Sequence, residues 1–313
     1  MLQQVSSPLA SRATEDLVAR SFEPFAFRDC WLTIAAGLLV ALLTLALTGV
    51  GISWASLAPL LGLTGLLIAA QVVYTWYRVN RRIAETYGVL AVLIIASLLA
   101  AVISHSSVRL GMPYIDASLS AADKAIGWHS PDLVLIFSDY PQVSNALATI
   151  YNTTLPVCFV CALALASCDR ASRAKEFAWC YVLCVLIAAV SSIFLPALGS
   201  TVFHGAENIV GLPTGAGNFH LPVVEYYRSD PAPVFSLGMV TGIVTFPSFH
   251  MVMALLVPYA LRGVGPVFWL ASSWAGLVGL SAVVIGGHYM IDLIIGAMCW
   301  AAAAAMMARR HPA

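Results

Sequence analysis

Long apolar stretches with few ionisable side chains recur along this chain. Stretches of roughly 17–25 such residues cross a bilayer as helices, because lipid offers no hydrogen-bond partner to an open backbone. The pattern predicts eight transmembrane helices, which we place at Trp31–Ile52, Trp54–Trp76, Thr86–Ser104, Val143–Ser167, Phe177–Leu198, Phe246–Leu261, Val264–Gly287 and Tyr289–Ala308. The predicted fold class is therefore all-α, a polytopic membrane protein.

The polar segments divide the chain unevenly. Residues 1–30 form an N-terminal segment, in which Thr14 could start a short interfacial helix; a mobile tail is an equal alternative. Residues 31–85 hold two helices that we expect to be additional to a six-helix core at 86–313. Within this core, two long connections at 109–142 and 199–245 alternate with short ones, so we expect functional elaboration on the side of the long connections.

Composition and charge placement agree with this picture. The chain is 60% hydrophobic and 10% charged, with a mean hydropathy of +0.89, whereas soluble domains carry about a quarter charged residues. This excludes a soluble enzyme, a nucleic-acid binder with a basic patch and a disordered chain. Only three of the 15 cations, Arg109, Lys124 and Arg228, fall on the side of the long connections. The positive-inside rule thus predicts cytoplasmic termini and extracytoplasmic long connections.

Three ionisable residues lie in or at the ends of predicted spans, where each is costly and suggests function. His250 lies near the outer end of the sixth span, and His288 opens the eighth. Asp292 follows His288 at i+4, on the same helical face. Each alone could be structural, but all three at one membrane surface favour a site.

This combination of side chains is typical of phosphoryl transfer. A carboxylate such as Asp292 can accept the Nδ1–H of His288 and leave Nε2 free as a nucleophile. A second histidine, His250, can protonate the leaving group. Arg228 could neutralise phosphate, or it could instead form a salt bridge with Glu225 or Asp230.

The motifs resemble the type 2 phosphatidic acid phosphatase superfamily, whose signature is Lys-x6-Arg-Pro, Pro-Ser-Gly-His and Ser-Arg-x5-His-x3-Asp. The second motif appears as Pro247-Ser-Phe-His250. The third appears as Ser281-Ala-x5-His288-x3-Asp292, with alanine in place of the family arginine. The first motif is absent, and its closest equivalents are the Asp123-Lys124 region and Tyr151-x4-Pro156. The resemblance spans about residues 86–308.

These departures resemble one branch, the inositol phosphorylceramide synthase and sphingomyelin synthase-like proteins with their bacterial relatives. The resemblance implies that His288 is the nucleophile, Asp292 its orienting carboxylate and His250 the acid for the leaving group. Arg228 and Ser248 would contact phosphate, with Lys124 as a weaker candidate. It implies no metal and no cofactor. A bacterial inner membrane is the implied location, with the active site extracytoplasmic.

The shortage of cations bears on the substrate. A phosphomonoester brings nearly two negative charges and a phosphodiester one, and uncompensated buried charge is costly. A cation-poor site therefore favours transfer of a phospho-headgroup from a lipid to a lipid acceptor. Hydrolysis of a lipid phosphate or isoprenoid diphosphate, with water as acceptor, is the first alternative. A proton-coupled transporter that uses the His288–Asp292 pair is the second. The sequence leaves the headgroup, the acceptor and the oligomeric state open.

Overall fold

The computed structural model describes residues 25–168, 170–206 and 209–310. The interfacial helix predicted from Thr14 lies outside these ranges. Of the predicted N-terminal segment only residues 25–30 are described, and they begin the first long helix.

The described chain is a bundle of long apolar helices, which confirms the all-α polytopic fold. Seven helices are long and apolar enough to cross a membrane. They are α2 (Phe25–Thr48), α3 (Trp54–Trp76), α4 (Arg81–Ser107), α7 (Pro141–Ser167), α8 (Ala171–Phe194), α12 (Pro266–Val284) and α13 (Met290–Arg310). An eighth apolar helix, α11 (Phe249–Ala260), is shorter.

The short helix α11 corrects the prediction of a sixth span over Phe246–Leu261. It has 12 residues, about 18 Å at 1.5 Å per residue, which is less than the apolar thickness of a bilayer. Ser248 caps the helix, because its hydroxyl accepts from the N–H of Met251 (3.4 Å). The residues before it are not helical, and Val240, Gly242 and Val244 among them line an internal cavity. Irregular backbone is tolerated inside a membrane protein at such a place.

Two further differences from the predicted boundaries have local reasons. The first helix ends at Thr48 instead of Ile52, because Gly49 takes a left-handed conformation (φ +67°) and residues 51–52 form strand β1. Strand β1 (Gly51–Ile52) pairs in parallel with β2 (Val234–Phe235). Helix α8 begins six residues earlier than predicted, since the buried ion pair of Lys175 with Glu85 (3.0 Å) allows charged residues in its first turns.

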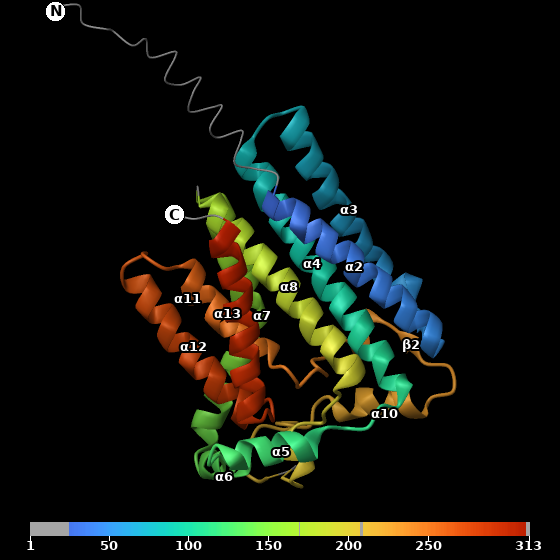
Figure 1. Ribbon diagram of the computed structural model, residues 1–313, viewed down its shortest axis with the longest axis vertical. Coiled ribbons are helices and arrows are strands. Elements are labelled where there is room, and N and C mark those ends of the chain that lie inside the picture. Colours follow the sequence, from blue (N-terminus) through green and yellow to red (C-terminus); the bar gives the residue numbers. More distant parts are fainter. Residues whose placement is uncertain (1–24, 169, 207–208, 311–313) are drawn as a thin grey trace, which may run out of the picture.

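The two long connections lie together at one end of the bundle. They contain the helices α5 (Asp116–Ala125), α6 (Ser130–Ser138), α9 (Ser200–Phe203) and α10 (Leu221–Ser229), and the 3-10 turns η1 (Val108–Leu110) and η2 (Leu237–Met239). The described chain starts and ends at the opposite end, where the α3–α4, α7–α8 and α11–α12 connections also lie (Figure 1). The long connections are therefore separated from both ends of the described chain by the length of the bundle.

Helices α2 and α3 flank α4 at one side of the bundle (Figure 1). Their outer faces carry exposed apolar side chains such as Leu39, Leu47 and Leu66. Such a face suits contact with lipid tails. The first two helices thus lie on the side of the bundle opposite α12 (Figure 1).

Candidate active site

His288 and Asp292 form a buried pair at the start of α13. The left-handed Gly287 (φ +71°) turns the chain after α12, and the N–H of His288 donates to the carbonyl of Ala282 (3.1 Å). Nδ1 of His288 lies 3.3 Å from Oδ2 of Asp292, and the two side chains are only 2% and 0% exposed. The same Oδ2 accepts the N–H of Tyr289 (3.0 Å). Asp292 therefore orients the ring, and Nε2 points away from it.

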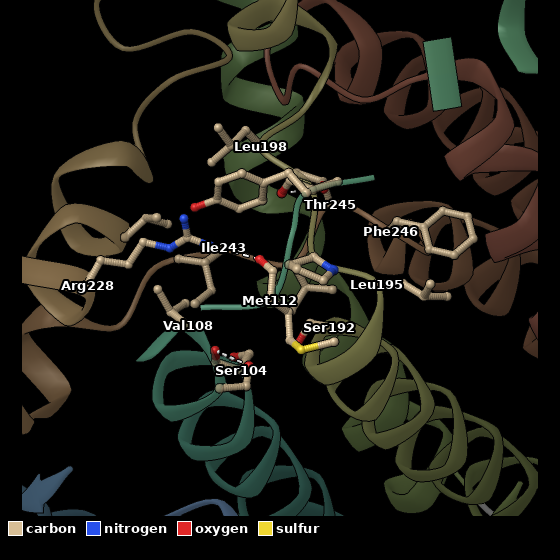
Figure 2. Close-up of a pocket in the computed structure, with 16 residues that line it drawn as sticks. Ser104, Val108, Met112, Ser192, Leu195, Leu198, Arg228, Ile243, Thr245 and Phe246 are labelled. Atoms are coloured by element: carbon tan, nitrogen blue, oxygen red, sulfur yellow. Dashed lines mark hydrogen bonds between the residues drawn. The ribbon is translucent and has the colours of Figure 1, made fainter. Parts of the chain in front are cut away.

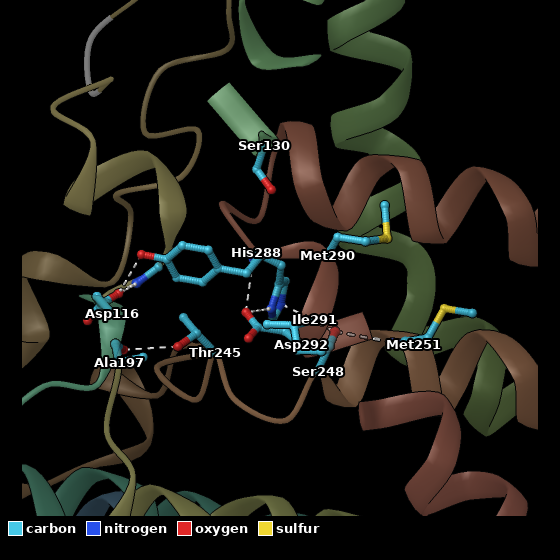
Figure 3. Close-up of polar contacts among 12 residues, drawn as sticks. Asp116, Ser130, Ala197, Thr245, Ser248, Met251, His288, Met290, Ile291 and Asp292 are labelled. Carbon is cyan, nitrogen blue, oxygen red and sulfur yellow. Dashed lines mark hydrogen bonds and ion pairs between the residues drawn. The ribbon is translucent and has the colours of Figure 1, made fainter. Parts of the chain in front are cut away.

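Two further residues of the predicted site, Ser248 and His250, lie at the start of α11, across from this pair. The hydroxyl of Ser248 is 3.5 Å from Nε2 of His288, and the rings of His250 and His288 have their centroids 6.0 Å apart. His250 stacks on the buried ring of Tyr151 (4.1 Å, 18° between planes). Tyr151 thus fixes the ring that faces the pair. Figure 3 shows Ser248, His288 and Asp292 converging.

Two buried carboxylates of α5 hold the segments around His288, and sequence reasoning missed this role. Asp123 accepts from the backbone N–H groups of Met290 (3.0 Å) and Ile291 (2.8 Å) at the start of α13. Asp116 accepts from the N–H groups of Leu198 (2.9 Å) and Gly199 (2.8 Å). The available signal was their spacing of seven residues, which puts both side chains on one face of α5.

Two further hydrogen bonds connect Asp116 and its neighbours to the turn before His288. The hydroxyl of Tyr289 donates to Asp116 (3.2 Å), and the N–H of Ser200 donates to the carbonyl of Gly287 (2.6 Å). The hydroxyls of Ser200 and Thr201 are buried without a partner among the described residues. Two hydrogen-bond donors are therefore free beside this turn.

An apolar cavity of about 430 Å³ opens beside His250. Helices α4, α7, α8 and α11 and the segment before α11 line it, with Ala100, Leu155, Val185 and Met253 among the apolar side chains. His250 and Tyr151 contribute to its wall. A hydrocarbon chain fits this lining, and one end of the space meets the candidate acid.

Arg228 lies outside this cluster, in a separate small pocket (Figure 2). Its guanidinium donates to the carbonyl of Met112 (3.2 Å) and lies over the ring of Tyr114 (4.0 Å). In the described part of the chain it forms no ion pair with Glu225 or Asp230, the alternative that the sequence left open.

Lys124 is exposed on α5, next to Asp123. Burial lowers the pKa of the nearby His204, and the charges of His129 and Lys124 lower it further. The structure therefore places Lys124 near His129 and His204 on the long connections, and it gives Lys124 no contact with the His288–Asp292 pair.

His220 is a buried neutral histidine behind the site. Its Nε2 lies 2.9 Å from the carbonyl of Leu198, to which a neutral ring can donate. Burial lowers the pKa of His220 to about 4. Within the described ranges, no group of three or more His, Cys, Asp or Glu side chains is arranged to hold a metal ion.

Comparison with known proteins gives one match. A family model described as PAP2 superfamily matches residues 117–306. The match begins in α5 and ends in α13, so it includes Asp123, His250, His288 and Asp292. It leaves out α4, which the sequence resemblance included. Neither a curated protein nor a solved structure matches the chain.

Proposed function

The chain belongs to the PAP2 superfamily, a family of enzymes with phosphatase-type chemistry on lipid phosphates, and from this premise we propose that it is a membrane lipid phosphotransferase. It would move a phospho-headgroup from one lipid to another through a phosphohistidine. One observation carries the proposal: Nδ1 of His288 is held by Asp292 while its Nε2 faces Ser248 and His250.

In the first step, Nε2 of His288 attacks the phosphorus of a phosphodiester lipid. The bond from phosphorus to the lipid alcohol breaks, and His250 gives its proton to the leaving oxygen. Asp292 stabilises the charge that develops on the His288 ring. The centroids of the two rings are 6.0 Å apart, so His250 and His288 border the same space and can act on the same phosphoryl group.

In the second step, the acceptor hydroxyl attacks the phosphohistidine. His250, now neutral, takes the proton of that hydroxyl, and the bond from phosphorus to Nε2 breaks. Ser248 and the free hydroxyls of Ser200 and Thr201 are the donors available to the non-bridging oxygens. Hydrogen bonds aimed at such oxygens are a large part of catalysis in phosphoryl transfer.

Two features favour a phosphodiester substrate over a phosphomonoester. Ala282 is fully buried where the family signature has an arginine, and Arg228 lies in its own pocket. The centre then has few cations for a doubly charged phosphate. The large apolar cavity beside His250 supports a lipid substrate. Because His288 is buried, an acceptor that binds in the site is favoured as the second substrate, and free water is disfavoured.

The proposal can be tested with labelled lipids. Purified protein is incubated with phospholipids radiolabelled in the phosphate, with and without diacylglycerol or ceramide, and the products are separated by chromatography. We expect a labelled product only when an acceptor is present. Release of phosphate or headgroup without an acceptor would favour the phosphatase alternative.

Two variants separate chemistry from general damage. We expect His288→Ala to abolish transfer and His129→Ala to retain it, since His129 lies on the outer surface and pairs with Asp132 (2.8 Å). Full activity of His288→Ala would overturn the enzyme mechanism. A transporter that uses the His288–Asp292 pair to carry protons would give no labelled product, with or without an acceptor lipid.

A further inference from the structure

We propose that the Arg228 pocket binds an oxyanion on the headgroup of the substrate, separate from the phosphate that reacts at His288. The inference rests on the proposed function and assigns Arg228 to headgroup selection. The pocket has a volume of about 30 Å³, which admits a small terminal group and excludes a hydrocarbon chain. A carboxylate or a phosphate is the chemical class that it fits.

Arg228 is held in place by contacts that are not ion pairs. Tyr114 supports one face of the guanidinium, and the carbonyl of Met112 accepts one of its N–H groups. The side chain is exposed, and among the described residues it forms no ion pair with a carboxylate. A planar guanidinium presents five N–H donors, and Met112 takes one of them. Two neighbouring N–H groups are left to bind an oxyanion with paired hydrogen bonds.

Thr245 lies between the pocket and the turn that carries His288. Its hydroxyl donates to the carbonyl of Ala197 (3.0 Å), and both residues line the pocket. Thr245 also packs near Gly199, where a Cβ would lie 3.5 Å from its methyl group and 2.8 Å from the carbonyl of Gly287. A headgroup in the pocket is therefore within a few residues' thickness of the turn that carries His288.

The pocket also adjoins the apolar cavity. Ser104, Ile243 and Val244 line both spaces. A lipid whose tail occupies the cavity, with its phosphate at His250 and His288, thus has a neighbouring place for the far end of its headgroup. Figure 2 shows Arg228 on one side of this pocket, with Thr245 on another.

Arg109 provides a matched control on the same face of the molecule. Its guanidinium donates to the backbone carbonyls of Asp230 and Pro231, and it does not line the pocket. Removal of its charge changes the electrostatic potential of the long connections and removes no side chain that lines the Arg228 pocket.

The test measures lipid binding in the His288→Ala background, so that no turnover is needed. Three chain-labelled lipids share tails and phosphodiester: phosphatidylglycerol, its oxidised counterpart phosphatidylglycerate with a carboxylate, and phosphatidylglycerophosphate with a terminal phosphate. Kd is measured in lipid nanodiscs for this background alone and with Arg228→Gln, Arg228→Lys or Arg109→Gln added.

We expect Arg228→Gln to weaken binding of at least one oxyanion lipid about tenfold and to leave phosphatidylglycerol within twofold. Arg228→Lys should fall between, and Arg109→Gln should match the background. The oxyanion lipid whose affinity falls more identifies the ligand of Arg228 as a carboxylate or a phosphate. Equal weakening of all three lipids, or no change in any, would overturn the inference. Unaltered phosphatidylglycerol binding shows that the variant is folded, and absence of turnover in wild type would contradict only the proposed function.

Discussion

Gly296 of α13 lies directly against the carbonyl oxygen of Ser248, so closely that a Cβ on Gly296 would be 2.3 Å from that oxygen. The N–H of Ser248 also donates to the carbonyl of Asp292 (3.0 Å). These two contacts fix the start of α11 against the first turns of α13. The distance from Ser248 to His288 therefore depends on a glycine outside the recognised motifs.

The close approach predicts that Gly296→Ala damages both stability and activity. The backbone of α11 must move to admit the methyl group, which costs about 1–3 kcal/mol, and a shift of this size lowers the rate by roughly 10²-fold. Gly276→Ala is the matched control, because open space surrounds Gly276 in α12. Thermal unfolding in detergent and the transfer assay check both variants, and equal behaviour of the two would contradict the prediction.

The pair geometry predicts a large effect of Asp292→Asn. The amide keeps the size of the side chain but removes the negative charge that stabilises the His288 ring. We expect kcat to fall about 10²–10⁴-fold with a small change in KM. Steady-state kinetics with a phosphodiester lipid measure both constants. A rise in KM with kcat unchanged would show that Asp292 acts in binding instead.

The contacts of α5 predict that Asp123→Asn lowers both stability and activity, although Asp123 does not contact the reacting groups. The amide can accept only with one oxygen, so at least one of the N–H groups of Met290 and Ile291 loses its partner. We expect a loss of about 1–3 kcal/mol of stability and a parallel fall in kcat. Asp132→Asn is the control, since Asp132 is exposed and pairs only with His129 among the described residues. Similar losses in both variants would contradict this role.

His220 predicts a loss of stability in acid. Its pKa is lowered from 6.5 to about 4 in the folded protein, so the unfolded chain binds more protons between these values. Stability is therefore constant above about pH 6.5 and falls as the pH drops towards 4, by about 3 kcal/mol from this residue.

The His220 effect can be isolated with His220→Gln, whose amide can still donate to Leu198. Thermal unfolding is followed from pH 7.5 to 4.5 for both proteins. We expect the stability difference between wild type and variant to change across this range. A constant difference would show that His220 does not titrate with folding.

The predicted orientation can be tested with an impermeant maleimide. Cys168 is exposed between α7 and α8, at the end of the bundle opposite the site. Val210, which is 92% exposed, lies on the outer loops. In intact cells we expect no labelling of Cys168 and strong labelling of Val210→Cys in a Cys168→Ser background. The reverse pattern would put the active site on the cytoplasmic side.

The sequence by itself determined the features that arise within one segment. Apolar runs gave the helices because backbone polar groups in lipid must be satisfied locally, and α3 has the predicted bounds Trp54–Trp76. The spacing of His288 and Asp292 placed them on one face of a helix by the same local geometry. The sixth span was predicted too long, because hydropathy does not register a serine cap.

Only the tertiary structure decided the features that join distant segments. Ser248 meets His288 across forty positions because Gly296 allows two backbones to touch. The carboxylates of Asp116 and Asp123 are buried anchors, although in sequence they look like any loop acids. Arg228 faces its own pocket instead of the histidines. Which loop side chains reach the site depends on the packing of long connections, and no periodicity encodes that packing.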